Sequence, residues 1–151
     1  MSASFFSIKD PLEQFNKYFA QACGVIKKDP NAFQLATIDP DGQPSVRTLL
    51  FKGIVRGGLS FYTNYESRKA KAMLAHPKTA MNFYWPELDM QIRVEGLVEK
   101  LTRDESEKYF VTRPRLSQIG AWASRQSQEI PNLEFLEQKV LELEKQYAGR
   151  D

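Results

Sequence analysis

A chain of 151 residues, of which 42% are hydrophobic and 26% charged, has the length and composition of one soluble globular domain. Its 21 lysines and arginines exceed its 19 acidic residues by only two, which argues against a general polyanion-binding protein. We therefore expect a single domain over residues 1–151, in which any basic function is local.

The few potential metal ligands and nucleophiles limit the chemistry further. Cys23 cannot form an internal disulfide, and its place in an apolar helical pattern indicates an inert, buried thiol. One cysteine and one histidine cannot build a zinc site. We expect that histidine, His76, to be a surface residue at a helix end, which leaves no Ser-His-Asp triad. No metal is predicted, and no catalytic acid or base stands out.

The sequence also contains no recognisable signal for membrane insertion or export. No apolar run approaches the ~18 residues of a membrane span. Residues 1–10 lack the basic start and apolar stretch of a signal peptide. We expect a cytoplasmic protein without a membrane partner.

Helix signals occur at four places. Asp10 is a capping residue before a proline, Pro77 ends a short helical pattern, Thr102 to Glu105 match a capping box, and Pro131 opens a last amphipathic pattern. The predicted helices run from Pro11 to about Lys28, over residues 67–76, from Thr102 onward, and from Pro131 to about Tyr147.

Strand signals alternate with turn residues. The turn PDGQP joins the first two runs as a hairpin, VRGG leads to a third, and PELD separates the last two. The predicted strands cover residues 32–39, 45–54, 59–64, 78–85 and 90–101. Five strands in hairpin order, with helices before, between and after them, imply an antiparallel sheet, and a small barrel protects its edges. The fold class is mainly β with flanking helices.

Cations and hydroxyls coincide at one predicted helix start. Ser67, Arg68 and Lys69 combine unpaired backbone N–H groups, the positive end of the helix dipole and two positive charges, which suits a phosphate. Solvation of two surface cations is the alternative that spacing alone leaves open.

Two further cations lie on the second predicted strand. Arg47 and Lys52 have opposite parity, so on a regular strand they face opposite sides, unless a bulge intervenes. They flank an apolar run, and cations in such a position are less usual than cations on a helix surface. Binding of an anion and a purely structural role are both open for them.

A donor-rich stretch near the C-terminal end, RPRLSQIGAWASRQSQ (113–128), contains three arginines and no Asp or Glu. Glycine-rich nucleotide-binding motifs are absent from the chain, so side chains and a helix start would have to hold any nucleotide. The aromatic and basic mixture FYTNYESRK (61–69) admits nucleic-acid binding, but core aromatics beside surface charge explain it as well.

The ordered series RTLLFK (47–52), FYTNYESRK (61–69), NFYWPELDMQIRVEG (82–96) and YFVTRPRLSQIGAWASRQS (109–127) resembles the pyridoxamine 5′-phosphate oxidases, flavin enzymes of vitamin B6 metabolism. The resemblance runs from about Asp10 to about Tyr147. It implies a homodimer of split β-barrels with FMN bound between two subunits, and no nucleic-acid partner.

The resemblance also assigns the ligands' contacts to residues of this chain. Arg47 and Lys69 are the expected partners of the FMN phosphate, because a dianion favours charge-assisted donors on fixed elements. The implied FMN contacts are Arg47, Thr48, Leu49, Leu50, Lys52, Tyr62, Thr63, Ser67, Arg68, Lys69, Gln91, Gln126 and Ser127. The implied substrate contacts are Lys52, Tyr109, Arg113 and Ser117. Arg115 and Arg125 receive no role, and a surface or interface ion pair is expected for each.

The family reaction oxidises pyridoxamine 5′-phosphate or pyridoxine 5′-phosphate to pyridoxal 5′-phosphate. Reducing equivalents pass to the flavin and then to O₂, which gives H₂O₂. The flavin supplies the redox chemistry, so the protein's task is to place the substrate ring against it.

The sequence departs from the family pattern at both ends. Family members usually continue beyond the helix that ends near Tyr147, and they usually carry an N-terminal extension that helps cover the substrate. We expect either a piece of a longer protein or a short relative with an open site. In the second case the alternative is a protein that binds FMN or pyridoxal 5′-phosphate with little oxidase activity.

Overall fold

The computed structural model describes residues 10–124 and 126–149. The chain forms two compact units. The first unit comprises Met1–Thr37, Pro44–Tyr62 and Lys78–Leu97, and the second comprises Ile38–Gln43, Thr63–Pro77 and Val98–Asp151. That these units make one domain, as the sequence suggests, stays a prediction.

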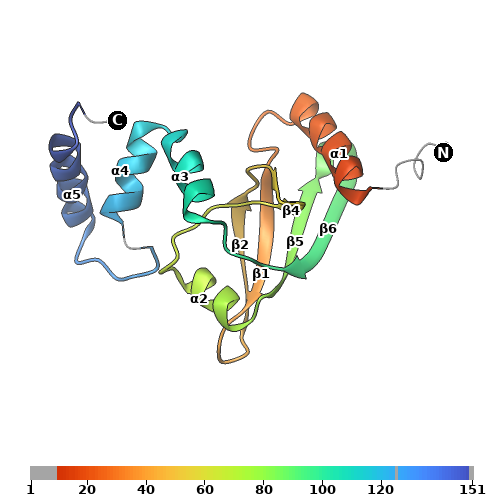
Figure 1. The fold of residues 1–151 in the computed structure, drawn as a ribbon, viewed down its shortest axis with the longest axis horizontal. Helices are drawn as coiled ribbons and strands as arrows, with labels where there is room; N and C mark the ends of the chain where they lie inside the picture. Colours follow the sequence, from red (N-terminus) through yellow and green to blue (C-terminus); the bar gives the residue numbers. More distant parts are fainter. Residues whose placement is uncertain (1–9, 125, 150–151) are drawn as a thin grey trace. The chain divides into compact units, whose positions relative to one another are not determined.

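A four-stranded sheet forms the centre of the first unit (Figure 1). Its order is β2 (Pro44–Leu50), β1 (Ala32–Ile38), β5 (Lys78–Trp85) and β6 (Met90–Leu97). The pairs β1 with β5 and β5 with β6 are antiparallel, with Leu35 opposite Met81 and Phe83 opposite Ile92. The antiparallel sheet predicted from the sequence is confirmed, and β5 has the predicted bounds.

Aromatic side chains form the core against one face of this sheet. Phe15 comes from α1 (Pro11–Val25), which begins as predicted, with the Asp10 side chain accepting from the backbone of Leu12. The Phe15 ring lies 5.0 Å from Phe83 and 5.2 Å from Phe51, measured between centroids. These rings are 5% exposed or less, so α1 is held by apolar burial.

Two predicted strands are shorter than expected. The run 45–54 ends as strand at Leu50. Of the run 59–64 only Leu59 is strand, as the last residue of β4 (Gly58–Leu59), which pairs with β3 (Ile54–Val55). Gly53 has φ 122°, a conformation that favours glycine and turns the chain out of β2. The Ser60 backbone still bonds to Lys52 and Gly53.

Other differences concern element ends. Strand β6 stops at Leu97 rather than continuing to residue 101, and β5 reaches it through a short 3₁₀ helix, η2 (Pro86–Leu88).

Cys23 is exposed, so the prediction of a buried thiol is wrong. The spacing of helix α1 turns Ala22 towards the core and its neighbour Cys23 towards solvent.

Helices make up most of the second unit (Figure 1). They are α2 (Arg68–Ala75), α3 (Arg103–Val111), α4 (Arg115–Ala123) and α5 (Leu133–Gln146). The capping box of Thr102 and Glu105 is confirmed, and His76 is an exposed C-cap. Helix α4 was not predicted as a separate element, and α5 is capped by Asn132, one residue after the predicted opening proline. Among the described helices, none is long and apolar enough to cross a membrane.

Candidate anion site at the start of α2

A buried ammonium marks the first turn of α2. Lys69 is 9% exposed, and its Nζ donates to Thr63 Oγ1 at 3.2 Å and to Gln126 Oε1 at 2.8 Å. Thr63 Oγ1 in turn donates to Gln126 Oε1 at 3.2 Å. We call Thr63, Lys69 and Gln126 the Lys69 cluster. Both of these acceptors are neutral oxygens, so these two hydrogen bonds do not offset the charge of the ammonium.

Backbone donors lie beside this ammonium. Ser67 is fully buried and is the N-cap of α2, with its Oγ accepting from the Ala70 backbone at 3.4 Å and donating to the Asn64 carbonyl at 2.7 Å. The first-turn N–H groups of a helix and its dipole favour an anion. Ser67 and Lys69 therefore lie together at a helix start, and the binding of a phosphate there stays a prediction.

Arg68 starts α2 and has an acidic partner that sequence reasoning missed. Its Nε donates to Asp39 Oδ2 at 2.9 Å, and its NH2 donates to the same oxygen. This hydrogen bond and the charge of Asp39 raise the pKa of Arg68 above its usual value. The Arg68 side chain is 65% exposed, whereas that of Asp39 is 6% exposed. Arg68 is therefore neither simply solvated nor buried.

The residues after α4 add a strained turn to the second unit. Ser127 is exposed and has φ 65°, in the left-handed region that a non-glycine residue rarely adopts. Such conformations occur at ligand sites more often than elsewhere. Ser127 directly follows Gln126, so the strained residue is the chain neighbour of a residue that accepts from the buried ammonium.

Arg47 is held on β2 of the first unit. Its NH1 donates to Thr37 Oγ1 at 2.7 Å and to the Leu35 carbonyl at 3.1 Å, and its NH2 donates to Ser45 Oγ at 2.6 Å. Thr37 is 2% exposed, so Arg47 shares the core face of the sheet. The parity argument for Lys52 does not apply, because β2 ends at Leu50.

The other first-unit residues assigned to FMN differ in exposure. Gln91 is exposed on β6, where its Nε2 donates to Asn82 Oδ1 at 2.7 Å, and Asn82 Nδ2 donates to Gln34 Oε1 at 3.0 Å. This chain of amides runs across three strands and orients Gln91. Of the rest, Thr48, Leu50 and Lys52 are exposed, and Leu49 and Tyr62 are half-buried.

Three residues assigned to the substrate lie near the junction of α3 and α4. Tyr109, Arg113 and Ser117 are all half-buried, and the Arg113 guanidinium lies 5.8 Å from the centroid of the Phe110 ring. Lys52, the fourth, belongs to the first unit. Arg115 lies on the surface, where its NH2 donates to the Tyr147 carbonyl at 2.6 Å, and an ion pair at a subunit interface stays a prediction. Arg125 lies outside the described residues.

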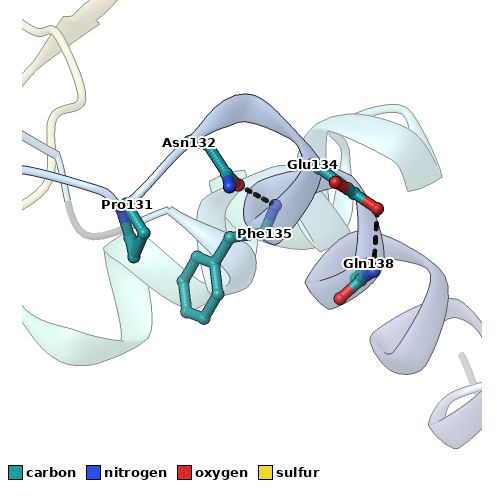
Figure 2. A pocket seen from close by; sticks show the side chains of 5 residues that line it. All are labelled: Pro131, Asn132, Glu134, Phe135 and Gln138. Atoms are coloured by element: carbon teal, nitrogen blue, oxygen red, sulfur yellow. Dashed lines mark hydrogen bonds between the residues drawn. The ribbon is translucent and has the colours of Figure 1, made fainter.

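Two hollows in the second unit lie away from these residues. One, of about 260 Å³, surrounds the first turn of α5, where Asn132 Oδ1 accepts from the Phe135 backbone and Gln138 donates to Glu134 (Figure 2). The other is an apolar groove of about 840 Å³ between residues 64–66, α3 and α4. Neither is lined by a residue assigned to FMN or to the substrate.

Comparison with known proteins identifies the class. A family model described as "Pyridoxamine 5'-phosphate oxidase" matches residues 19–147. The chain belongs to the pyridoxamine 5′-phosphate oxidase family. The resemblance inferred from the sequence motifs is thereby confirmed.

Curated relatives carry the corresponding name. A pyridoxine/pyridoxamine 5′-phosphate oxidase of Rubrobacter xylanophilus is 49% identical over 141 residues, which cover 93% of this chain and 65% of that protein. One of Cupriavidus taiwanensis is 49% identical over 139 residues, which cover 92% and 66%. The chain thus spans about two thirds of the length of these relatives.

Solved structures confirm the split-barrel fold. PhzG from Burkholderia lata, in complex with tetrahydrophenazine-1-carboxylic acid, superposes with a TM-score of 0.91 at 26% identity, over 99% of this chain and 74% of that chain. A pyridoxamine 5′-phosphate oxidase-related, FMN-binding protein from Nostoc punctiforme gives a TM-score of 0.66 at 20% identity, over 84% and 71%. The second likeness concerns the fold alone.

Proposed function

We propose that this chain binds FMN and oxidises pyridoxamine 5′-phosphate or pyridoxine 5′-phosphate to pyridoxal 5′-phosphate, with O₂ as the acceptor. The observation that carries the proposal is the Lys69 cluster at the start of α2. A buried ammonium in the first turn of a helix is an arrangement that a phosphate monoester fits.

The proposed partners of the FMN phosphate are the cations that the family resemblance assigns to it. In the second unit, Ser67, Arg68 and Lys69 supply a hydroxyl, a guanidinium and an ammonium on consecutive residues. In the first unit, Arg47 supplies a guanidinium that Thr37 and Ser45 hold in one orientation. Fixed donors bind a dianion with little loss of side-chain freedom.

The remaining FMN contacts follow from the family assignment. Gln91 is oriented by Asn82, so it can present its other amide atoms to the flavin ring. Gln126 already contacts Lys69, and Ser127 continues the same turn. The other proposed contacts are Thr48, Leu49, Leu50, Lys52, Tyr62 and Thr63.

The substrate's own phosphate would bind to Lys52, Tyr109, Arg113 and Ser117. Arg113 is well suited to this role because its ring contact with Phe110 limits the motion of the guanidinium. A phosphate handle of this kind positions the pyridine ring without touching the atoms that react.

When bound, FMN would accept two electrons from the substrate carbon that becomes the aldehyde and pass them to O₂. With pyridoxamine 5′-phosphate the balance takes up one water and one O₂ and releases ammonia and H₂O₂. The chain's own residues bind and orient the two phosphates and the ring. No residue is assigned as a catalytic acid or base.

A B6 vitamer is favoured over a tricyclic acid as the substrate. The relatives named for B6 phosphates are 49% identical to this chain, whereas the PhzG structure is 26% identical. A homodimer and a cytoplasmic location belong to the same proposal.

An anaerobic absorption spectrum tests the proposal. The purified chain, loaded with FMN, is mixed with pyridoxamine 5′-phosphate in the absence of O₂ and then exposed to air. We expect the flavin bands to bleach and to return in air with formation of pyridoxal 5′-phosphate. Bands that persist would leave a flavin-binding protein without oxidase activity, and failure to bind flavin would overturn the whole proposal.

A further inference from the structure

A buried carboxylate supports the exposed guanidinium of Arg68. Asp39 is 4% exposed, although it follows β1 at the start of the turn to β2. Its Oδ2 receives both hydrogen bonds from Arg68. Removing a carboxylate from water is costly, and a pair of this kind contributes little to stability compared with apolar packing. A role in placing Arg68 explains why a buried acid lies here.

The turn fixes Asp39 independently of Arg68. Its backbone N–H donates to the Gln43 carbonyl at 2.9 Å, and its carbonyl accepts from the Gly42 N–H at 2.8 Å. These two bonds hold the backbone of Asp39 in place without involving Arg68. Its other oxygen, Oδ1, is buried and has no hydrogen-bond partner among the described residues.

Asp39 engages one edge of the Arg68 guanidinium. The bonds come from Nε and NH2, which form one side of the planar fork. The donors of NH1 belong to the other side, and the side chain is 65% exposed. An arginine held in this way can bind a planar or tetrahedral anion without first losing its own freedom of rotation.

We propose that Asp39 is a positioning residue that fixes the Arg68 fork for the phosphate of FMN. The inference rests on the proposed function. Two effects oppose each other here: the negative charge of Asp39 weakens the attraction between Arg68 and an anion, whereas the fixed orientation of Arg68 strengthens binding. The proposal states that orientation is the larger effect.

The test compares two ligands that differ only in the phosphate. The affinities of FMN and riboflavin are measured by flavin fluorescence titration of the apoprotein, for the wild type, Asp39→Asn, Asp39→Glu, Arg68→Ala and the double variant Asp39→Asn/Arg68→Ala. Asp41→Asn is the matched control, because Asp41 is an exposed carboxylate in the same turn whose Oδ1 accepts from the Gln43 N–H. A thermal melt of each apoprotein reports the stability separately.

We expect Asp39→Asn to weaken FMN binding by about fivefold, since an unrestrained arginine must be ordered on binding. Asp39→Glu keeps the charge but displaces it by one methylene, so it should weaken FMN binding as well. Riboflavin affinity should not change in either variant, and Asp41→Asn should behave as the wild type. In the Arg68→Ala background, Asp39→Asn should have no further effect, because the two residues act as a unit.

Several results would overturn the inference. Tighter FMN binding by Asp39→Asn with an unchanged Asp39→Glu would show that Asp39 acts only by its charge. Equal losses for FMN and riboflavin would show a merely structural role, and so would a full Asp39→Asn effect in the Arg68→Ala background. A wild type that does not prefer FMN over riboflavin would contradict the proposed function, which is a distinguishable outcome. If Asp39→Asn does not fold, Asp39→Glu alone still decides between orientation and charge.

Discussion

The ammonium of Lys69 donates a 2.8 Å hydrogen bond to the side-chain oxygen of Gln126, which lies 57 residues further along the chain. The contact joins the first turn of α2 to the residues after α4, two segments that the sequence analysis could relate only through the family resemblance. Because Gln126 is a neutral acceptor, this hydrogen bond does not offset the charge of the ammonium.

Replacing Lys69 by methionine tests the phosphate role of this ammonium. Methionine keeps most of the volume of a side chain that is 9% exposed, so the loss should be one of charge and not of packing. We expect FMN affinity to fall by about ten- to a hundredfold, the size of one charge-assisted hydrogen bond. Equilibrium titration of the apoprotein measures it. Lys71→Met, an exposed lysine on the same helix, should leave the affinity unchanged.

Arg47→Lys tests whether the fork of Arg47 is needed. Arg47 makes three hydrogen bonds with the Leu35 carbonyl, Thr37 and Ser45, and a lysine ammonium cannot reproduce this geometry. We expect FMN binding to weaken by about tenfold although the charge is retained. Isothermal calorimetry checks this value. Wild-type affinity in Arg47→Lys would mean that only the charge at this position matters.

Arg113→Ala should chiefly raise the KM for pyridoxamine 5′-phosphate. A phosphate handle binds the ground state and the transition state alike, so kcat should change little while KM rises by about tenfold or more. Steady-state oxygen uptake measures both constants. Arg115→Ala, which loses a contact with the Tyr147 carbonyl, is the control and should keep the wild-type KM. A normal KM with a collapsed kcat in Arg113→Ala would contradict the assignment.

Thr102→Ala should destabilise the protein without affecting flavin binding. The Thr102 Oγ1 accepts from the Glu105 backbone at 3.2 Å, and the Glu105 side chain accepts from the Thr102 backbone at 2.7 Å. Loss of such a cap costs about 1 kcal/mol. Urea unfolding at constant m-value measures the change. Glu107→Ala, which loses only an exposed pair with Arg103, should have a smaller effect, and the reverse order would argue against the cap.

Local chemistry predicted much of the fold. Strand β5 and the caps at Asp10 and Thr102 follow from the residues alone, because alternation and capping act over a few positions. The run 59–64, which follows the turn VRGG, is predicted as a strand, but the structure pairs only Leu59 of it. Propensity describes the side chains and does not supply a partner strand, so the end of pairing at this point could not be predicted.

The candidate site was predictable in part. The sequence indicated the positive charges of Arg68 and Lys69 at the start of α2, because cap and cations are adjacent. It did not indicate Asp39 as the partner of Arg68, since the pair spans 29 positions. One signal was available: Phe33, Leu35, Thr37 and Asp39 share a parity and are all buried, so alternation along β1 places an acid on the core side.

The affinity of the wild-type apoprotein for FMN relative to riboflavin tests the central claim most directly. We expect FMN to bind on the order of a hundredfold more tightly, since two or more charge-assisted contacts to the phosphate are lost with riboflavin. Equal affinities for the two flavins would contradict it.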